Sequence, residues 1–248
     1  MLLQGDGDDL TDGKMTVAQS AASWPWHLSS GYMFVVKSSY HHGNLQAAVL
    51  ERAAAVISAQ GPYALSLRSL AADLGVSHTA PRHHFGSREG VLNALAAQGF
   101  SWLADRLGTV RDGGGGFLDL GVAYVEFAVE HPAHFQVMFT PTLLDETHPE
   151  LRAARERAFA ELTGGADQVV AAQRTDDVAA AVIAGWSLAH GLATLALSGN
   201  LDSAGVRELL ADQDLASITR RTAGMLFASG LPTGAPSTGH SGAGQAEA

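Results

Sequence analysis

Residues 77–84 (S-H-T-A-P-R-H-H) concentrate side chains that donate hydrogen bonds or carry positive charge. Hydroxyl, imidazole and guanidinium groups of this kind contact phosphate oxygens and base edges in nucleic acids. Only Ala80 and Pro81 in this stretch are apolar. A helix this short and this polar must face something other than a hydrophobic core, and we expect it to face the major groove of DNA. The residues expected there are Ser77, His78, Thr79, Arg82, His83 and His84.

The surrounding stretch from Ser66 to Arg88 supplies the elements that would position those side chains. Ser66 can cap a first helix, whose apolar residues follow the i, i+3, i+4, i+7 spacing of one buried stripe. Gly75 stands where a chain leaving a helix adopts a left-handed conformation, which costs glycine little. Ser77 is expected to cap the second helix, and a third is expected to open at Ser87. This order is typical of a helix-turn-helix.

Basic residues outside the polar helix extend the predicted DNA contact. Arg68 and Arg88 stand at helix starts, where they can reach phosphates. Lys37, His41 and His42 precede the first helix and could act in the same way, although free solvated side chains are an equal alternative. Which residues read bases and which hold phosphates is left open by the sequence.

The distribution of charge agrees with DNA binding even though the whole chain carries a net charge of −10. Residues 37–88 hold five basic and two acidic residues, a net charge of +3. Residues 1–36 carry −3, and residues 89–248 carry −10. Attraction to phosphate acts over roughly 8–10 Å, so the charge of the segment matters more than the total.

Histidines that are close in sequence raise the question of a metal site: His41-His42, His83-His84 and His131 with His134. Adjacent residues of a helix point about 100° apart, so neither adjacent pair makes a natural shared site. The chain has no cysteine and no carboxylate at a familiar ligand spacing beside these histidines. We therefore expect no metal and no other cofactor.

Catalysis has no support in the sequence, which lacks a nucleophile elbow, a phosphate-binding glycine loop and paired carboxylates. Trp186 and His190 lie at i and i+4, so their side chains are neighbours on one helix. One reading is a packed core pair with a hydrogen-bonded histidine. The other is a ligand pocket in which the histidine orients the ligand. The pocket residues would be Tyr124, Phe127, Phe135, Met138, Trp186 and His190.

Hydrophobic spacing predicts an all-α chain without strand alternation or internal repeats. Helices are expected from about Asn44 to Gln60, from Ser87 to the break at 111–116, over 117–130, over 150–173 with a turn at 164–165, from Asp176 or Asp177 to Ser198, and over 203–229. The organisation expected is a poorly structured extension (1–36), a helix-turn-helix domain (37–86), a larger helical domain (87–229) and a low-complexity tail (230–248). Met33 leaves open a translation start near the first predicted helix. No run approaches 18 apolar residues, so we expect no membrane span.

Residues 40–95, with G-P-Y-A-L-S-L-R-S-L-A-A-D-L-G-V-S-H-T-A-P-R-H-H-F-G-S-R at their centre, resemble the DNA-binding domain of TetR-family transcriptional regulators. His131-Pro132, Phe135, Met138-Phe139 and later G-W-S-L-A-H-G resemble a regulatory domain named for its Trp-His-Gly pattern, here Trp186, His190 and Gly191. Where the family usually has tyrosine, any residue, His or Tyr, then Phe, this chain has Arg82, His83, His84 and Phe85. Arg82 thus replaces a tyrosine that typically touches a phosphate, a contact that arginine can also make.

The resemblance implies a homodimer whose recognition helices enter successive major grooves, and a ligand pocket that alters their spacing. Small residues along the helix after Asp177 allow close helix approach, and together with the last helix they form the candidate dimer interface; ordinary packing within the chain is the alternative. The interface residues expected are Val178, Val182, Gly185, Ala189, Leu192, Leu210 and Ile218. We therefore expect a cytoplasmic regulator, most simply a repressor, released from a palindromic operator by a small apolar effector. The alternative is a helical small-molecule-binding protein or enzyme that has lost specific DNA binding.

Overall fold

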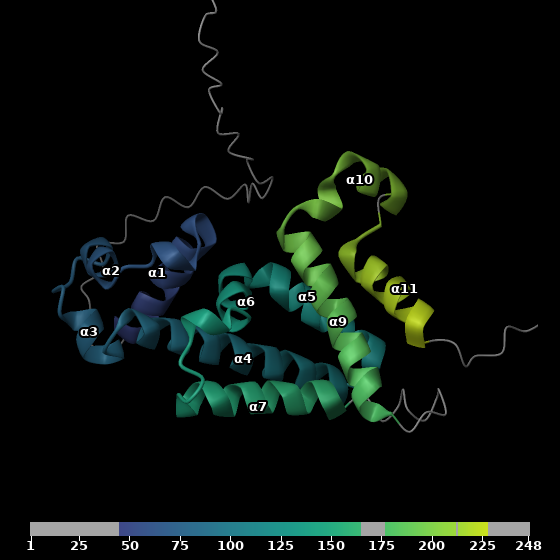
Figure 1. Ribbon diagram of the computed structural model, residues 1–248, viewed down its shortest axis with the longest axis horizontal. Coiled ribbons are helices and arrows are strands. Elements are labelled where there is room, and N and C mark those ends of the chain that lie inside the picture. The colour runs from purple at the N-terminus through teal and green to yellow at the C-terminus, as the bar shows by residue number, and fades with distance from the viewer. Residues whose placement is uncertain (1–44, 165–176, 212, 228–248) are drawn as a thin grey trace, which may run out of the picture. The chain divides into compact units, whose positions relative to one another are not determined.

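The computed structural model describes residues 45–164, 177–211 and 213–227, and these residues form helices, turns and loops without any strand. The all-α prediction is confirmed. The α-helices are α1 (Leu45–Gln60), α2 (Leu67–Asp73), α3 (Ala80–Phe85), α4 (Arg88–Asp112), α5 (Phe117–Glu130), α6 (Pro132–Met138), α7 (Pro149–Gly164), α9 (Val178–Leu197), α10 (Ala204–Leu210) and α11 (Leu215–Phe227) (Figure 1). The 3-10 turns are η2 (Pro62–Ala64), η3 (Pro141–Leu143) and η4 (Asn200–Asp202). The predicted extension over 1–36, the tail over 230–248 and the end of the helix predicted to reach 173 lie outside the described residues.

Helix α1 illustrates how apolar spacing sets the packing. Leu45, Val49, Ala53 and Ile57 follow one another at every fourth position, and all four are buried. Residues at this spacing share one helix face, so α1 presents a single stripe to the rest of the core. The N–H of Gly61 donates to the carbonyl of Ile57 at 2.8 Å, and η2 follows at once. Helix α1 thus ends at Gln60, as predicted, and the chain turns at Gly61-Pro62.

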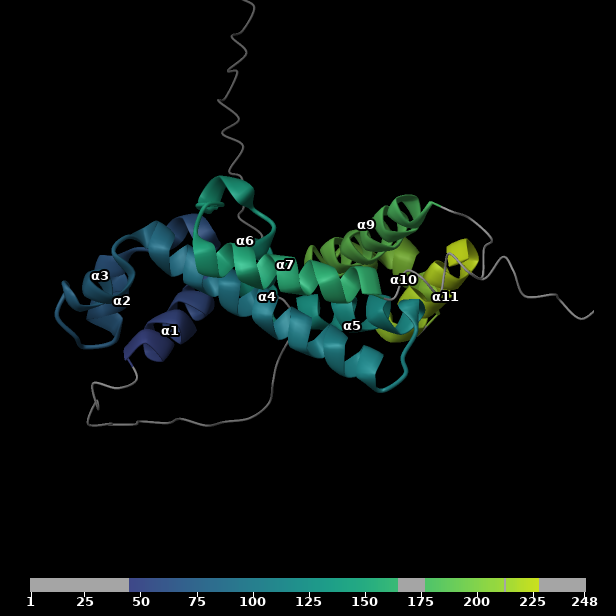
Figure 2. The same cartoon turned by 90° about the horizontal axis from the view of Figure 1, so that it is seen from below.

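Helix α4 is the element around which the other helices pack. Ser87 caps it by accepting a hydrogen bond from the N–H of Gly90 at 3.1 Å, as predicted. Its wide apolar face contacts α1, α5, α6 and α7. Figures 1 and 2 both show α7 running beside α4, with α1, α2 and α3 near the N-terminal end of α4. A helix surrounded in this way needs apolar residues on more than one side, which explains its broad pattern.

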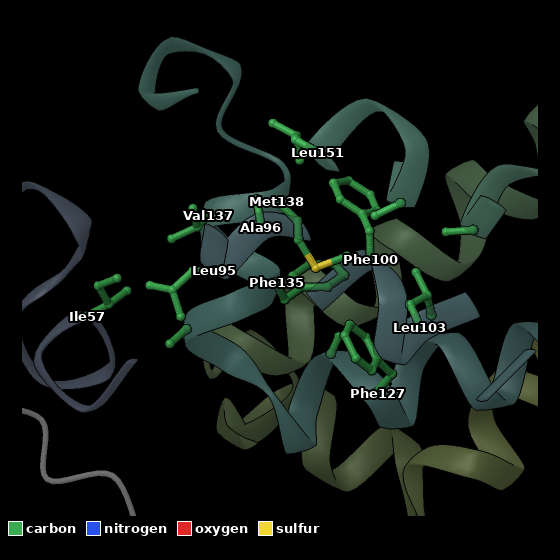
Figure 3. Packing of buried hydrophobic residues seen from close by; sticks show 14 of the residues in the cluster. Ile57, Leu95, Ala96, Phe100, Leu103, Phe127, Phe135, Val137, Met138 and Leu151 are labelled. Atoms are coloured by element: carbon green, nitrogen blue, oxygen red, sulfur yellow. The ribbon is translucent and has the colours of Figure 1, made fainter. Parts of the chain in front are cut away.

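The core is continuous along α4. Side chains of α6 (Phe135, Val137 and Met138) converge on Leu95 and Phe100 of α4 (Figure 3). The cluster extends to Ile57 of α1 on one side and to Leu151 of α7 on another. Helix α6 also contacts η2. The helix-turn-helix segment therefore shares its core with the helices that follow it.

One element prediction is wrong. The stretch expected to form a single helix over 203–229 is divided into α10 and α11. Ala211 ends α10 in a left-handed conformation, with φ of 46°. Asp214 then accepts the N–H of Ser217 at 2.7 Å, which caps a new helix. Apolar spacing continues across the break, so the cap at Asp214, and not the spacing, determines that the stretch forms two helices.

Candidate functional site

The helix-turn-helix has the predicted first helix and turn. Ser66 caps α2 through a long hydrogen bond of 3.5 Å from the N–H of Ser69. Leu70 and Ala71 are buried, and Leu67 and Leu74 pack against the same core. Gly75 has φ of +65°, the left-handed conformation predicted for it. The geometry of the turn could therefore be predicted from residue types alone.

The recognition helix begins later than Ser77 alone would suggest. Helix α3 starts at Ala80, and its N-cap is Thr79. Ser77 lies one turn earlier, where its hydroxyl is 2.9 Å from that of Thr79 and its carbonyl accepts the N–H of Ala80 at 2.9 Å. Ser77 thus organises the turn leading into α3 and does not cap α3 itself.

The polar side chains of this segment form one surface, which we call the recognition surface. Its members are Ser77, His78, Thr79, Arg82, His83 and His84, and all six are exposed. Pro81 is buried beneath it, while Ala80 and Phe85 pack against the core. The short helix is thus held by its few apolar residues, and the exposed arginine and histidine side chains remain available for a partner.

The two arginines predicted to hold phosphates are placed differently. Arg68 is exposed in the first turn of α2. Arg88 turns inward: its Nε donates to the carbonyl of Leu65 at 3.1 Å, and one terminal nitrogen donates to that of Pro62 at 2.7 Å. This geometry argues against a phosphate contact by Arg88 and gives it a structural role. Lys37, His41 and His42 lie outside the described residues.

The predicted pocket residues are packed against one another. Tyr124, Phe127, Phe135 and Met138 are each 4% exposed or less. The indole N–H of Trp186 donates to the hydroxyl of Tyr124 at 3.2 Å, and that hydroxyl lies 2.9 Å from Nδ1 of His190. Burial raises the pKa of Tyr124, so its hydroxyl keeps its proton and can donate to His190. Burial also lowers the pKa of His190, which favours the neutral imidazole that accepts this bond.

Phe139 belongs to the same aromatic cluster, although it is not among the six predicted pocket residues. Its ring centroid is 4.7 Å from that of His190 and 4.8 Å from that of Phe135. Phe135 in turn stacks on His190 at 5.2 Å. Phe135 and Phe139 are four residues apart, a spacing that places two side chains next to each other on a helix and could have identified Phe139 as a member of the cluster. Phe127 differs from the others, because its recorded ring contact is with His131.

A small cavity is lined by residues of α5, α7, α9 and α11. It measures about 20 Å³, and its lining residues are Phe117, Leu120, Gly121, Leu162, Gly185, Leu188, Ala189, Thr219, Ala223 and Phe227. The hydroxyl of Thr219 is already bonded to the carbonyl of Leu215 at 2.7 Å. The cavity therefore offers apolar surface and almost no free hydrogen-bonding capacity. None of the six predicted pocket residues lines it.

The predicted interface residues divide into two groups. Val182, Ala189 and Leu192 are buried within this chain, and Gly185 lies directly against the ring of Phe117. Val178 is exposed, and Leu210 and Ile218 are half-buried. The first group packs inward, consistent with the contacts of α9 with α5 and α11. The side of α9 away from these contacts carries the exposed Ile183 and Leu195.

The length and composition of α9 alone would allow it to cross a membrane, since its 20 residues have a mean hydropathy of 1.6. Serine, histidine and threonine interrupt its apolar residues, so the sequence shows no uninterrupted apolar run of that length. Core helices of soluble proteins can be equally long and apolar. Ala181, Val182, Ala189, Leu192 and Ala193 are buried on the side of α9 that packs on α5 and α11, whereas the other apolar residues of this helix are exposed or half-buried.

Two histidines pack on Trp102 between α4 and α6. The ring of Trp102 lies 4.7 Å from that of His134 and 5.0 Å from that of His131. Nε2 of His134 is 3.0 Å from the amide oxygen of Gln98. Burial, with a smaller contribution from the charge of His131, lowers the pKa of His134 to about 4. The described part of the chain holds no group of three or more potential metal ligands.

Comparison with known proteins gives matches over both parts of the chain. Residues 49–95 match the family model described as bacterial regulatory proteins of the tetR family, and residues 117–218 match the tetracyclin repressor-like C-terminal domain. The uncharacterized HTH-type transcriptional regulator YobS of Bacillus subtilis (strain 168) is 28% identical over 97 residues, which are 38% of this chain and 51% of YobS. The chain thus spans about half the length of this curated relative.

Solved structures show the same fold. A protein of unknown function from Rhodococcus sp. RHA1 is 28% identical, with a TM-score of 0.63, over 78% of this chain and 98% of its own. The TetR family transcriptional regulator PfmR from Thermus thermophilus is 20% identical, with a TM-score of 0.54, over 73% of this chain and 97% of its own. With both domains matched and the helix-turn-helix in place, this chain belongs to the TetR family of bacterial transcriptional regulators.

Proposed function

We propose that this chain is a homodimeric transcriptional regulator, most simply a repressor, that binds a palindromic operator and leaves it when a small apolar effector binds. The observation that carries the proposal is the recognition surface. Its six polar side chains are all exposed on a helix-turn-helix whose apolar residues are used for packing. A solvated helix on a larger bundle would have no need for this concentration of donors and positive charge.

The recognition surface also has few competing ion pairs. Arg52 binds Asp73 at 2.8 Å, which occupies one nearby carboxylate. Among the described residues, neither Arg68 nor Arg82 forms an ion pair. Two exposed guanidinium groups therefore remain available for phosphates. A dimer would present two such surfaces to half-sites about one helical turn apart or slightly more.

The proposed dimer uses α9, α10 and α11. Large apolar side chains are exposed on all three helices: Ile183 and Leu195 on α9, Leu209 on α10, and Met225 and Leu226 on α11. Exposed apolar residues gathered on neighbouring helices are what an interface presents before its partner is added. The interface proposed here therefore moves from the buried side of α9 to the exposed side, while Val178, Leu210 and Ile218 stay among its candidates.

The proposed effector is small and apolar and enters between α5, α9 and α11, beside the cavity. The apolar lining supports this chemistry, and the aromatic cluster of Tyr124, Trp186 and His190 adjoins it through α5 and α9. An effector larger than the cavity would have to displace side chains at its wall. It would release DNA only through a higher affinity for the released state than for the bound state.

Electrophoretic mobility shift tests the proposal with the full-length protein and duplex DNA from upstream of its own gene, across salt concentrations. A specific complex that weakens steeply with salt is expected. The absence of a specific complex at low salt would contradict the regulator function. Retained binding of small apolar molecules in that case would favour the helical binding protein instead. Such a regulator would act in the cytoplasm, where the DNA is.

A further inference from the structure

His190, the histidine of the Trp-His-Gly pattern, lies in an aromatic cluster built from three helices. Tyr124 comes from α5, Phe135 from α6 with Phe139 directly after it, and Trp186 and His190 from α9. Phe135 stacks on the imidazole with ring centroids 5.2 Å apart, and Phe139 meets it edge to face at 4.7 Å. These rings hold the imidazole in the orientation in which Nδ1 faces Tyr124.

The hydroxyl of Tyr124 determines which nitrogen of His190 carries a proton. The indole N–H of Trp186 can only donate, so the hydroxyl oxygen accepts its bond at 3.2 Å. Tyr124 is 1% exposed, and the other partner of its hydroxyl among the described residues is Nδ1 of His190, at 2.9 Å. The hydroxyl proton must point at Nδ1, because a proton on Nδ1 would leave this buried hydroxyl proton without an acceptor. His190 is therefore neutral, with its own proton on Nε2.

The N–H at Nε2 of His190 remains as an unused donor. Within the described part of the chain no group accepts a hydrogen bond from it, and the nitrogen is accessible from outside. Half-buried Phe139 and Trp186 border the imidazole, with centroid distances of 4.7 and 6.3 Å. One directed donor bordered by aromatic surface is an arrangement that binds a mainly apolar ligand with a single polar group.

The cluster favours an uncharged ligand. With His190 neutral, none of the five side chains of the cluster carries a charge. A charged group placed against them would lose hydration without gaining an ion pair. The group that complements an N–H is an acceptor, and a carbonyl oxygen is an acceptor without net charge.

We propose that His190 binds, through Nε2–H, the carbonyl oxygen of a neutral apolar ligand such as a ketone, an aldehyde or an ester. Tyr124 is the positioning residue, because its hydroxyl keeps the proton of His190 on Nε2. This inference rests on the proposed function, since it assigns one polar group to the otherwise apolar effector. The bonds from Trp186 to Tyr124 and from Tyr124 to His190 run in the same direction, so each strengthens the next donor, and Nε2–H is the last of them.

NMR of the full-length protein with 15N-labelled histidine tests the tautomer near neutral pH. The signals of His190 are assigned as those lost in His190→Phe or His190→Gln. In the wild type, Nδ1 should show the shift of an unprotonated nitrogen and Nε2 that of a protonated one. Tyr124→Phe should populate both tautomers. Trp186→Phe is the matched control, since it removes the donor to Tyr124 but keeps the bond to Nδ1, and it should retain the wild-type tautomer. A proton on Nδ1 in the wild type would overturn the inference.

Acetophenone and 2-phenylpropene measure the ligand preference, because a carbonyl oxygen in the first is a CH₂ group in the second. The ratio of their affinities should favour acetophenone about 3- to 10-fold more in the wild type than in His190→Phe. Comparing the two proteins removes the difference in hydrophobicity between the probes. Tyr124→Phe should change the ratio in the same direction by a smaller factor.

An equal ratio in the wild type and His190→Phe, or His190 signals that do not respond to acetophenone, would overturn the inference and leave Nε2–H as a solvated group. The mobility shift of the wild-type protein separates this result from the proposed function. A specific DNA complex together with an equal ratio would overturn the role of His190 alone. A preference for acetophenone without any specific DNA complex would contradict the regulator function and support the ligand chemistry.

Discussion

Arg82 and Arg88 show how one residue type takes two roles within seven positions. Arg82 is exposed on the recognition surface without an ion pair to any described residue. Arg88 donates two hydrogen bonds, to the carbonyls of Pro62 and Leu65. The first is free to meet a phosphate, and the second holds the corner between η2 and α2 against the start of α4. The two residues are therefore separable by experiment.

Replacing Arg82 with alanine should weaken binding to all duplexes and reduce the salt dependence. If Arg82 neutralises one phosphate, the slope of log K against log salt should decrease in magnitude by about 0.9. Thermal stability should stay close to that of the wild type, because the side chain is exposed. An unchanged slope would mean that Arg82 contacts no phosphate.

Replacing Arg88 with alanine should act on stability. The variant leaves two partly buried carbonyls without their charged donor, which costs about 1–3 kcal/mol in the free energy of unfolding. Urea unfolding measures this loss. Under conditions where the variant is folded, its salt slope should equal that of the wild type. A reduced slope with unchanged stability would restore the phosphate role to Arg88.

At the scale of elements, the contact between α4 and α6 contains a neutral histidine. In the folded chain the pKa of His134 is about 4, below the value of about 6.5 expected in the unfolded chain. Between these values the unfolded chain binds a proton that the folded chain does not. Stability should therefore decrease as the pH falls from about 6.5 to about 4, by an amount on the order of 2 kcal/mol.

Unfolding in urea at several pH values measures this dependence. His134→Phe keeps a ring on Trp102 but cannot titrate, so its stability should decrease less over the same range. If the wild type and this variant follow the same pH dependence, the effect belongs to other groups. At neutral pH the free energy of unfolding of His134→Phe should differ little from that of the wild type. Half-exposed Gln98 can bond to water in this variant in place of His134.

Three helical glycines allow a matched test of packing around the cavity. A Cβ at Gly121 or Gly191 would meet no other side chain or distant backbone within 4 Å, whereas a Cβ at Gly185 would overlap the ring of Phe117. Gly121→Ala and Gly191→Ala should each gain up to about 1 kcal/mol in stability from helix propensity. The gain should be similar at the two sites, because the added methyl group would meet nothing within 4 Å at either.

Gly185→Ala should instead destabilise the protein, since Phe117 must move to make room. Chemical unfolding of the three variants under the same conditions ranks their free energies of unfolding. A clearly larger gain for Gly121→Ala than for Gly191→Ala would show that the methyl group at Gly121 is buried by a movement of its surroundings. A stable Gly185→Ala would show that Phe117 can move at little cost, as an effector entering there would require.

The helices with strong periodicity were predictable from the sequence. Helix α5 has the bounds expected of it, 117–130, and α4 begins at the predicted Ser87 cap. The orientation of Arg88 was not predictable, because its partners are backbone carbonyls 23 and 26 residues away. Nor could the sequence decide which side of α9 faces inward, since alanine, glycine and leucine occur on both sides. That choice depends on where Phe117 and α11 pack.

At the scale of the whole molecule, the exposed side of α9 should carry dimerisation. Ile183 and Leu195 are 52% and 42% exposed, too much for residues of this size in a finished core. Ile183→Glu should place a charge in the proposed interface, shift the protein towards monomer and weaken operator binding, because one half-site alone binds less tightly. Sedimentation velocity measures the shift.

Phe159→Glu provides the control for this prediction. Phe159 is also a large apolar residue, 51% exposed, but it lies on α7, outside the proposed interface. This variant should sediment as the wild type does. A wild-type protein that is monomeric at micromolar concentration would contradict the proposed dimer, and a dimer broken by Phe159→Glu would move the interface to α7.

The two hydrogen bonds from Arg88 to the carbonyls of Pro62 and Leu65 have a mechanical consequence. They join the corner before α2 to the first turn of α4, so the N-terminal end of this helix cannot rotate without taking that corner with it. Helix α4 has 25 residues, which corresponds to a rod about 37 Å long. A tilt of about 5° around its far end would displace the near end by roughly 3 Å, close to the 3.4 Å rise of one base pair. A tilt of α4 by this small angle, with α1 and α6 moving with it, would thus move the recognition surface by about the spacing of one base pair.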